Sequence, residues 1–409
     1  MGGETEKALY VGAREAAAEL GVKLPTLYAY VSRGWIRSES VGGKSRARRY
    51  RVEDVRRLKE RAQGRRDPGK VAEGALDWGM PVMKSRIALI SDGRLYYRGR
   101  DAVALASRGS IEVVAALIWT GDPENAPDLF GGQSRHRPPR RALPNLTPFE
   151  GFGTLLPLAA AEDPASYDLR PFPVAKTGAR ILRLMADFAG AGDGHTGASV
   201  ADTLRRGWVP GNPEAAALLG AAMVLCADHE LNVSAFTARC VASSGATPYA
   251  VVAAGLAALS GVRHGGQVEL VEALLGEAER AGSARDALAG RLKRGEKIPG
   301  FGHSLYPGGD PRGAELLRLT AAAYPRAAAV ASASATAAEA LDLLGERPTV
   351  DFGLAVLARA LGLPPGGAVA LFALGRTVGW IGHAIEQYEG GSLIRPRARY
   401  VGEPPHDLA

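Results

Sequence analysis

The sequence predicts a mainly helical protein that carries a small basic module at its N-terminal end. Of its 409 residues, 46% are hydrophobic and only 6% are aromatic, while alanine is abundant. This composition favours close-packed helices over β-sandwiches. From residue 174 onward, Ala/Leu-rich segments alternate with short turns and no strand signal of any length occurs. A chain of this size can bury a sizeable core and should hold two or three domains.

Positive charge is concentrated at one end of the chain. The formal net charge is +7, yet residues 1–70 hold 17 Lys and Arg against 9 Asp and Glu, and the remainder holds 33 against 34. This asymmetry predicts a module that faces a polyanion, attached to a nearly neutral globular body.

The basic end has the pattern of a small helix-turn-helix unit. We expect a helix over 14–20 that stops at Gly21, and a second helix that begins at Pro25 and ends at Gly34. A hairpin follows, with strands over 36–41 and 44–50 around Gly42-Gly43, and then a third helix from 52 to about 62. This order resembles the winged helix of the MerR and excisionase type.

That resemblance implies a domain of residues 1–62 that binds duplex DNA. The second helix would face the major groove and the hairpin would neutralise phosphates. The residues concerned are Thr26, Tyr28 and Arg33 for the groove, and Lys44, Arg46, Arg48 and Arg49 for the phosphates. The alternative is an appendage that supports solubility or dimer formation, with its arginines solvated.

The middle of the chain is expected to contain a linker, a hairpin and a long loop. Residues 63–80 carry Gly, Pro and charge without helical periodicity and predict a linker. A hairpin over 87–98 is indicated by Asp92-Gly93 between apolar runs, and 111–119 predicts a buried helix. Residues 122–153 are rich in Pro, Gly and Arg and predict a surface loop. Its arginines, either solvated or available to phosphates, include Arg135, Arg137, Arg140 and Arg141.

We expect a cytoplasmic protein without disulfides, metal or a membrane span. Cys226 and Cys240 offer neither a disulfide framework nor metal-ligand spacing, and residues 1–9 contain no apolar run typical of a signal peptide. Residues 240–262 are uncharged, but Pro248 and several glycines predict a buried core helix with a loop in front.

Three of the seven histidines stand in polar or glycine-rich settings. His229 lies in Asp-His-Glu-Leu-Asn, His264 precedes Gly-Gly, and His303 ends Gly-Phe-Gly-His. Glycine beside histidine lets backbone approach a ligand and lets the side chain project from a turn. Further along, Asp351 stands alone in an apolar stretch, where a carboxylate must be partnered or functional. It could equally be the N-cap of a helix that begins near Phe352.

Six segments, in order, resemble the successive motifs of the citrate synthase family. They are ADHELNVSAFTAR, GVRHGGQVE, IPGFGHSLYPGGDPR, PTVDF, GRTVGWIGHAIEQ and IRPRARYVG. The resemblance extends from about residue 80 to the C-terminus. It implies a large helical domain of 81–264 and 356–409, a small helical domain of 265–355, and a homodimer. It also implies condensation of acetyl-CoA with oxaloacetate to citrate and CoA, without a further cofactor.

The resemblance assigns roles to individual residues. The condensation needs a base, a donor to the enolate oxygen and a donor to the ketone oxygen. The family's motifs give these roles to Asp351, His264 and His303. The positions that bind the oxaloacetate carboxylates are matched by His229, Arg312, Arg376 and Arg395, the last reaching the neighbouring subunit's site. The loop that wraps the CoA adenine is matched by Lys297, Ile298, Pro299, Gly300, Phe301 and Gly302. His195 and His383 are expected to be structural.

Two departures from the family pattern leave alternatives open. The family commonly has a cation shortly after GFGH that meets CoA phosphate, whereas 304–309 contain none, which predicts weaker acetyl-CoA binding. After His264 the chain reads Gly-Gly-Gln-Val-Glu instead of Gly-Gly-Ala-Asn-Glu, a change that bears on acyl specificity. One alternative is a 2-methylcitrate synthase that uses propionyl-CoA, because one methylene gives only about 1–3 kcal/mol of discrimination. Another is a non-catalytic transcription regulator that senses oxaloacetate or CoA.

Overall fold

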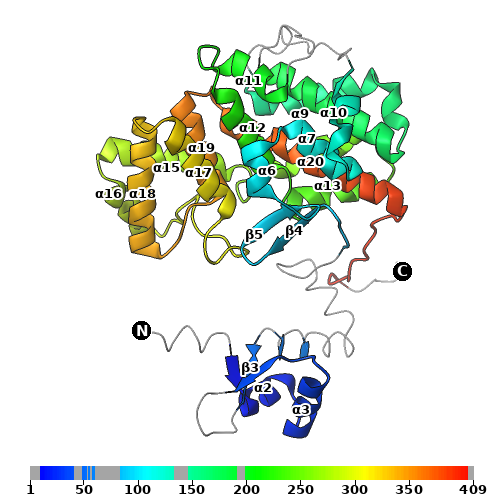
Figure 1. Cartoon of the computed structure of the whole chain (residues 1–409), viewed down its shortest axis with the longest axis vertical. Helices are drawn as coiled ribbons and strands as arrows, with labels where there is room; N and C mark the ends of the chain where they lie inside the picture. Colours follow the sequence, from blue (N-terminus) through cyan, green and yellow to red (C-terminus); the bar gives the residue numbers. More distant parts are fainter. Residues whose placement is uncertain are drawn as a thin grey trace. The chain divides into compact units, whose positions relative to one another are not determined.

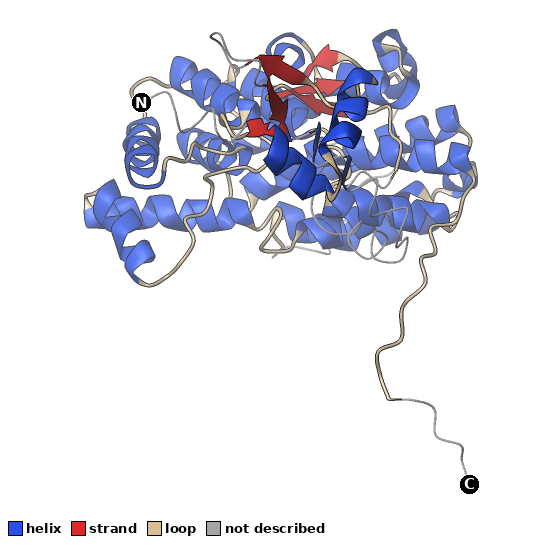
Figure 2. Cartoon of the chain, turned by 90° about the horizontal axis from the view of Figure 1, so that it is seen from below, coloured by secondary structure: helices blue, strands red, loops and turns tan. Residues whose placement is uncertain are grey.

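The protein consists of two compact units, residues 1–84 and 85–409, each with its own hydrophobic core (Figure 1). The computed structural model describes residues 10–40, 48–52, 54–55, 58–59, 83–132, 146–190 and 199–403. Helices dominate, and the described strands form two small sheets (Figure 2).

The N-terminal unit combines a three-stranded antiparallel sheet with two helices. Its strands β1 (Tyr10–Gly12), β2 (Ser38–Ser40) and β3 (Arg48–Arg51) pair in the order β1-β3-β2. Helix α2 (Ala13–Leu20) ends at Gly21 in the left-handed conformation, and α3 (Leu24–Ser32) carries proline in its first turn. Both helices and the paired strands β2 and β3 were predicted, whereas β1 was not.

The third predicted helix is only partly within the described residues. Val52, Asp54, Val55, Leu58 and Lys59 are helical there, and Val55 is fully buried in the core of the unit. Asp54 accepts a bidentate ion pair from Arg37, which fixes this segment against the start of the hairpin. The predicted linker over 63–80 lies outside the described residues.

The larger unit begins with the hairpin that the sequence predicted. Strands β4 (Ala88–Ser91) and β5 (Arg94–Tyr97) are antiparallel, and β6 (Arg100–Asp101) pairs with β5. Asp92 and Gly93 both have positive φ, 52° and 72°. Positive φ at both central residues matches the right-handed twist of the flanking strands, so a tight two-residue turn is possible here.

Helices form the rest of this unit, which is mainly α as predicted. They are α6 (Ala102–Arg108), α7 (Ile111–Thr120), α8 (Ala126–Phe130), α9 (Pro148–Ala161), α10 (Pro171–Ala189), α11 (Val200–Trp208), α12 (Ala215–Cys226), α13 (Val233–Ser243), α14 (Pro248–Leu259), α15 (Gln267–Ala281), α16 (Ala284–Lys293), α17 (Pro311–Ala323), α18 (Ala328–Leu344), α19 (Val350–Leu361) and α20 (Gly367–Gly390). Short 3₁₀ helices span Pro123–Asn125 and Pro164–Tyr167.

Helix α20 is the central element of this core. It contacts α7, α9, α10, α12, α13, α14 and α19 (Figure 1). A Cβ on Gly375 would lie 2.4 Å from a backbone oxygen of α12, and a Cβ on Gly379 would lie 2.4 Å from the backbone oxygen of Ala227. These two glycines therefore permit the close approach of α20 to the end of α12. By length and composition α20 could cross a membrane, but its apolar window is 100% buried, as expected of a core helix. Residues 240–262 contain the end of α13 and the largely buried α14, which is the buried core helix predicted for this segment.

The prediction of one surface loop over 122–153 was wrong in part. A 3₁₀ turn, α8 and the start of α9 lie within it, and proline occupies the first turn of each. Proline lacks the N–H that is unsatisfied at a helix start, so it begins helices as readily as it marks loops. Thr147 and Glu150 add a capping box at α9. Arg135, Arg137, Arg140 and Arg141 lie outside the described residues.

Candidate active site

The segment between α12 and α13 carries the first predicted histidine in a fixed conformation. Asp228 is fully buried and His229 is 8% exposed. Glu230 adopts a φ of 51° and accepts a hydrogen bond from Ile90 N on β4. Asn232 caps α13 by accepting from the backbone of Ser234 and Ala235. The turn that holds His229 is thereby tied to the hairpin and to the next helix.

The predicted glycine-rich loop before His303 packs directly against the start of α19. Gly302 N donates to Arg347 O at 3.0 Å, and Thr349 N donates to Gly300 O at 2.8 Å. Gly300 and Gly302 have φ of 82° and 74°, which L side chains rarely adopt. These hydrogen bonds bring His303 to the helix whose first turn carries Asp351.

Asp310 joins the starts of two helices. It caps α17 by accepting from Arg312 N, and its second oxygen accepts from Val350 N of α19 at 3.0 Å. Its carboxylate also makes a bidentate pair with the Arg312 guanidinium, at 2.9 and 2.8 Å. Burial opposes ionisation here, but Arg312 outweighs it and lowers the pKa of Asp310. Arg312, only 3% exposed, is therefore held rigidly beside α19.

Two of the predicted histidines are in contact. The rings of His229 and His303 lie 5.2 Å apart at 73°, and Tyr306 lies 4.9 Å from His303. The Tyr306 hydroxyl is 3.0 Å from His229 Nε2, and Arg312 Cζ lies 5.6 Å from the centre of the Tyr306 ring. The segment after α12, which carries His229, therefore meets the segment before α17, which carries His303 and Tyr306.

The third histidine, His264, contacts side chains of α13 and α20. Its Nε2 lies 2.8 Å from Ser234 Oγ, which also accepts a hydrogen bond from Trp380 Nε1 at 3.1 Å. Its ring packs edge-on against Phe372, and Arg376 Cζ lies 5.0 Å from the same phenyl ring. His264 and Arg376 are therefore neighbours across Phe372.

All three histidines are neutral near pH 7. Burial, followed by the charges of Arg376 and Arg312, lowers the pKa of His264 to about 3. Burial and Arg312 also lower the pKa of His229, well below its ordinary value, and the pKa of His303. His303 Nδ1 accepts from Leu305 N at 3.2 Å, so its proton is on Nε2. A neutral imidazole with a fixed N–H is a hydrogen-bond donor.

Asp351 has the properties of a base. Burial raises the pKa of its carboxyl to about 6, with Arg312 acting in the opposite direction, and Thr349 Oγ1 donates to it at 3.2 Å. The alternative of an N-cap is wrong, because α19 begins at Val350 and its N-cap is Thr349. A half-buried carboxylate that remains ionised at pH 7 with a raised pKa accepts protons more readily than an ordinary aspartate.

Arg376 is a buried cation with an unused donor. It is 1% exposed, and its Nε donates to Cys226 O at 2.8 Å. Within the described part of the chain, its Nη1 is buried without a hydrogen-bond partner, as is Asp228 Oδ2. A buried guanidinium N–H without a partner is costly, and an anionic ligand would satisfy it.

The other predicted site residues differ in their placement. Arg395 is exposed beyond α20 and is not brought to this cluster within a single chain. Lys297 and Gly302 are exposed, whereas Ile298, Pro299, Gly300 and Phe301 are buried. His383 is fully buried between Asp228 and Arg239 and fits the structural role predicted for it. His195 lies outside the described residues.

Sequence reasoning missed several residues of the cluster. Tyr306, Ser234 and Asp310 were given no role. Tyr306 lies three positions after His303, which is a usable local signal. Ser234 and His264 are separated by 30 positions, so their contact depends on the fold.

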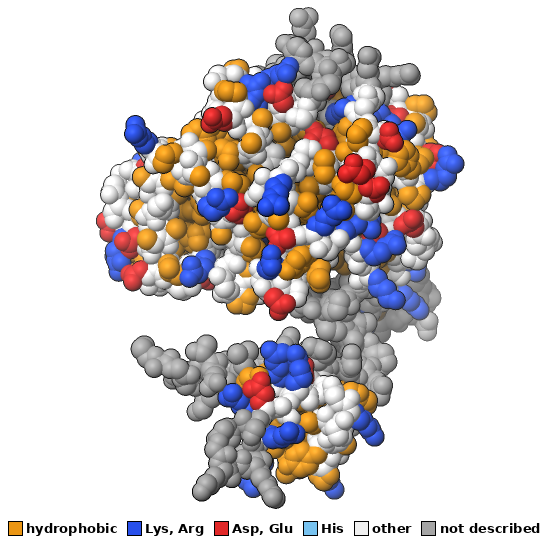
Figure 3. Space-filling view, viewed as in Figure 1, with side chains coloured by type: hydrophobic (Ala, Val, Ile, Leu, Met, Phe, Trp, Pro, Cys, Tyr) orange, Lys and Arg blue, Asp and Glu red, His pale blue; other side chains and the backbone are white. Residues whose placement is uncertain are grey.

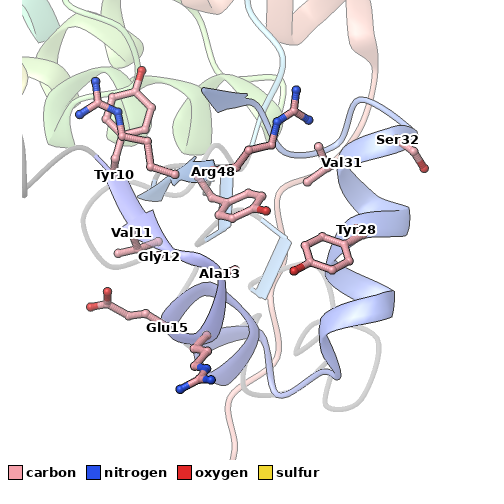
Figure 4. Close-up of a pocket in the computed structure, with 12 residues that line it drawn as sticks. Tyr10, Val11, Gly12, Ala13, Glu15, Tyr28, Val31, Ser32 and Arg48 are labelled. Atoms are coloured by element: carbon pink, nitrogen blue, oxygen red, sulfur yellow. The ribbon is translucent and has the colours of Figure 1, made fainter. Parts of the chain in front are cut away.

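The N-terminal unit has an open groove of 1010 Å³. Tyr28 of α3 and Arg48 of β3 line it together with β1 and the start of α2 (Figure 4). Tyr28 is 51% exposed, and Arg33 is exposed with its guanidinium 5.5 Å from the Trp35 ring. Arg49 is engaged by Glu39 and Tyr10. Thr26 is partly exposed on α3, while Lys44 and Arg46 lie outside the described residues.

Comparisons with known proteins agree with this architecture. The family described as citrate synthase, C-terminal domain, matches residues 75–397. A putative citrate synthase 2 of Mycobacterium tuberculosis is 41% identical over 44% of this chain, which spans about half the length of that relative. A 2-methylcitrate synthase of M. tuberculosis is 31% identical over 75% of this chain and 84% of its own length. A citrate synthase structure from Pyrobaculum aerophilum is 25% identical, covers 82% of this chain and 93% of its own, and has a TM-score of 0.71.

Proposed function

Because the chain belongs to the citrate synthase family, we propose that it condenses acetyl-CoA with oxaloacetate and releases citrate and CoA. The observation that carries this proposal is that three titratable groups from distant parts of the chain all lie within the electrostatic influence of the buried Arg312. These are a carboxylate with a pKa of about 6 and two neutral imidazoles, those of His264 and His303. Such a set can remove a weakly acidic proton and donate to two carbonyl oxygens at once.

In the proposed reaction, Asp351 takes a proton from the methyl group of acetyl-CoA. His264 donates an N–H to the thioester oxygen, where negative charge develops. The enol carbon then attacks the ketone carbon of oxaloacetate, whose oxygen accepts a hydrogen bond from Nε2–H of His303 as negative charge develops on it and is then protonated by water. Water hydrolyses the resulting citryl thioester, which gives citrate and CoA.

The donor role of His264 depends on Ser234. The Ser234 hydroxyl has one proton and lies 2.8 Å from both His264 Nε2 and Asn232 Oδ1. The hydroxyl can donate to either of them; because Asn232 Oδ1 already accepts two backbone N–H groups, the proposed reaction directs the hydroxyl proton to His264. With Nε2 accepting, the N–H of neutral His264 is at Nδ1, free to donate to a substrate oxygen.

Two buried arginines would bind the carboxylates of oxaloacetate. The unpartnered Nη1 of Arg376 supports this role, since a carboxylate oxygen would satisfy it. Arg312 offers a second guanidinium beside His229 and His303, although Asp310 engages one edge of it. Arg395, exposed beyond α20, would complete the site of a second subunit in a homodimer.

A thiol-release assay with oxaloacetate tests the proposed reaction. Asp351→Asn should lower kcat by about 10²–10⁴-fold, the usual contribution of a general base. Asp187→Asn is the matched control, because burial also raises the pKa of Asp187 but the residue lies on α10, outside the cluster. Equal activity of wild type and Asp351→Asn would exclude Asp351 as the base.

Propionyl-CoA is the second candidate acyl donor. The 31% identity to a 2-methylcitrate synthase over 75% of the chain favours testing it. Comparing kcat/KM for acetyl-CoA and propionyl-CoA on the same preparation separates the two activities. A ratio above about 10 in either direction assigns the substrate, given what one methylene contributes.

For the N-terminal unit we propose binding of duplex DNA through α3 and the β2–β3 hairpin. The proposal is supported by the net positive charge of residues 1–70 and by the exposure of Tyr28, Arg33 and Arg48. A duplex titration at several salt concentrations tests it, since phosphate contacts give a linear fall of log affinity with log salt. Binding without a salt slope, or no binding, excludes this role. DNA binding that depends on oxaloacetate or CoA, with no thiol release, would instead indicate a regulator.

A further inference from the structure

Tyr306 occupies the centre of the histidine cluster. Two short turns fix its backbone, because Tyr306 N donates to His303 O and Gly309 N donates to Tyr306 O, both at 2.9 Å. Its side chain is 1% exposed, and its hydroxyl is 3.0 Å from His229 Nε2. Its ring also contacts His303 and lies beneath Arg312. One side chain therefore touches three residues of the proposed site.

The hydroxyl and the imidazole share one hydrogen bond in two conceivable directions. Burial raises the pKa of Tyr306 to about 12, so the phenol keeps its proton at neutral pH. Burial and then Arg312 and Arg376 lower the pKa of His229, so its ring is neutral and has one N–H and one lone pair. Either the phenol donates to Nε2, or Nε2–H donates to the phenol.

The surrounding charges favour the phenol as donor. The Arg312 guanidinium over the Tyr306 ring draws electron density from the phenol, which strengthens it as a donor and weakens it as an acceptor. Of the hydrogen bonds found within the described residues, none involves His229 Nδ1. A donor at Nδ1 is thus available to a ligand once Nε2 accepts from Tyr306.

We propose that Tyr306 is a positioning residue whose hydroxyl donates to His229 Nε2, holds that ring in place and leaves its Nδ1–H for a carboxylate of oxaloacetate. The proposal rests on the proposed function and extends it to a residue outside the predicted site. Without the hydroxyl, His229 would distribute its proton over both nitrogens, and its buried Nε2 would lack a partner. Substrate binding should weaken, whereas the chemistry at Asp351, His264 and His303 should persist.

Tyr306→Phe tests this, because it keeps the ring against His303 and Arg312 and removes only the hydroxyl. The KM for oxaloacetate should rise about tenfold, as expected for one lost buried hydrogen bond. The kcat should fall less than about threefold, and the KM for acetyl-CoA should not change. Unchanged KM for oxaloacetate would overturn the proposal.

Tyr249→Phe is the matched control. Tyr249 is also 1% exposed and its hydroxyl also makes a 3.0 Å hydrogen bond, to Asp163, but it lies on α14. Both variants should lower the unfolding temperature to a similar extent. Only Tyr306→Phe should raise the KM for oxaloacetate, and an equal rise in both variants would assign the effect to general loosening of the fold.

A double-mutant cycle with His229→Gln tests whether Tyr306 acts through His229. Calorimetry with oxaloacetate should show that Tyr306→Phe changes the Kd less than about twofold once His229 is replaced. A full tenfold effect in that background would overturn the proposal. If the wild type neither binds oxaloacetate nor releases thiol, the proposed function itself fails. If the wild type is active and Tyr306→Phe has the same KM for oxaloacetate, only the role of Tyr306 fails.

The proton position can also be observed without changing Tyr306. In ¹⁵N-histidine-labelled protein, the signals that disappear in His229→Gln belong to His229. Its Nε2 should have the shift of an unprotonated nitrogen and its Nδ1 that of a protonated one. The reverse pattern would overturn the assignment of Tyr306 as donor.

Discussion

The arginines that we propose to contact ligands occupy opposite environments in the two units. Arg312 and Arg376 are 3% and 1% exposed, and hydrogen bonds to Asp310 and Cys226 O fix their orientation. Arg33 and Arg48 of the N-terminal unit are exposed, and on the visible face of the larger unit Lys and Arg are interspersed with Asp and Glu (Figure 3). Charges interact strongly in a dry interior and weakly at a hydrated surface. Arg312 and Arg376 are therefore suited to recognise one small anion. Arg33 and Arg48 are suited to make separate, additive contributions to the affinity for a polyanion.

Replacement of Arg376 should have the largest effect on function and little effect on stability. Arg376→Met should lower kcat/KM for oxaloacetate by about 10³-fold, because a desolvated charge contact to a carboxylate is lost. The free energy of unfolding should fall little, since within the described residues Arg376 forms no ion pair, although the charge of Asp228 stabilises it, and the variant also removes the cost of burying a cation. Thiol release and thermal unfolding measure the two quantities.

Arg239→Met is the control for this comparison. Arg239 is also buried, at 4% exposure, but it pairs with Glu386, which is itself buried. Among the described residues, removing it leaves the Glu386 carboxylate with only the exposed Arg86, 3.9 Å away, as a cationic partner, and should destabilise the protein by up to about 3–5 kcal/mol. If Arg376→Met unfolds as early as Arg239→Met, Arg376 serves the fold rather than a ligand.

Asp351→Asn should stabilise the protein while it removes activity. The pKa of Asp351 in the folded state, about 6, lies above the ordinary value of 3.8. The folded state therefore binds more protons between these values, so ionised Asp351 lowers stability progressively as pH rises through that range. The variant should be more stable than wild type at pH 7, by up to about 3 kcal/mol, and the difference should vanish near pH 4. Urea unfolding at both pH values measures it, and a less stable variant at pH 7 would contradict a carboxyl whose pKa is raised by burial.

Arg48→Ala should have the smallest effect, confined to the N-terminal unit. The slope of log affinity for duplex DNA against log salt should become less steep by about 0.9, equivalent to one phosphate contact. Thiol release should be unchanged. Arg318→Ala, on the surface of the larger unit, is the control and should leave the slope as it is. An unaltered slope in Arg48→Ala would remove the hairpin from the proposed DNA interface.

The sequence predicted those helices and strands that carry a strong local signal, such as a turn motif or a long apolar run, and missed those that depend on pairing with distant residues. The Asp92-Gly93 turn and the apolar run of α7 were sufficient for a hairpin and a buried helix. The three residues of β1 are too few to show alternation, and their strand character comes from pairing with β3. Prolines in 122–153 indicated a loop where three of them begin helices, because the same fixed φ serves both.

The residue types of the candidate site could be proposed from the sequence, whereas its hydrogen bonds could not. His264, His303 and Asp351 were found through their motifs, and the structure adds the neutral state of both rings and the raised pKa of the acid. The contacts of Ser234 with His264 and of Tyr306 with His229 join residues 30 and 77 positions apart. No local pattern encodes such pairings, because they arise only when α13, α20 and the loop before α17 pack together.

The pH dependence of kcat/KM for oxaloacetate-dependent thiol release, which reports the ionisation of the free enzyme, tests the central claim most directly. Asp351 must be ionised to accept the proton, and its pKa of about 6 requires the rate to fall below that pH. The account predicts a single acidic limb with an apparent pKa near 6 and about a tenfold loss for each further unit of acidity. A rate that stays constant from pH 7 down to about pH 4.5 would show that the base is not a buried carboxylate of this kind.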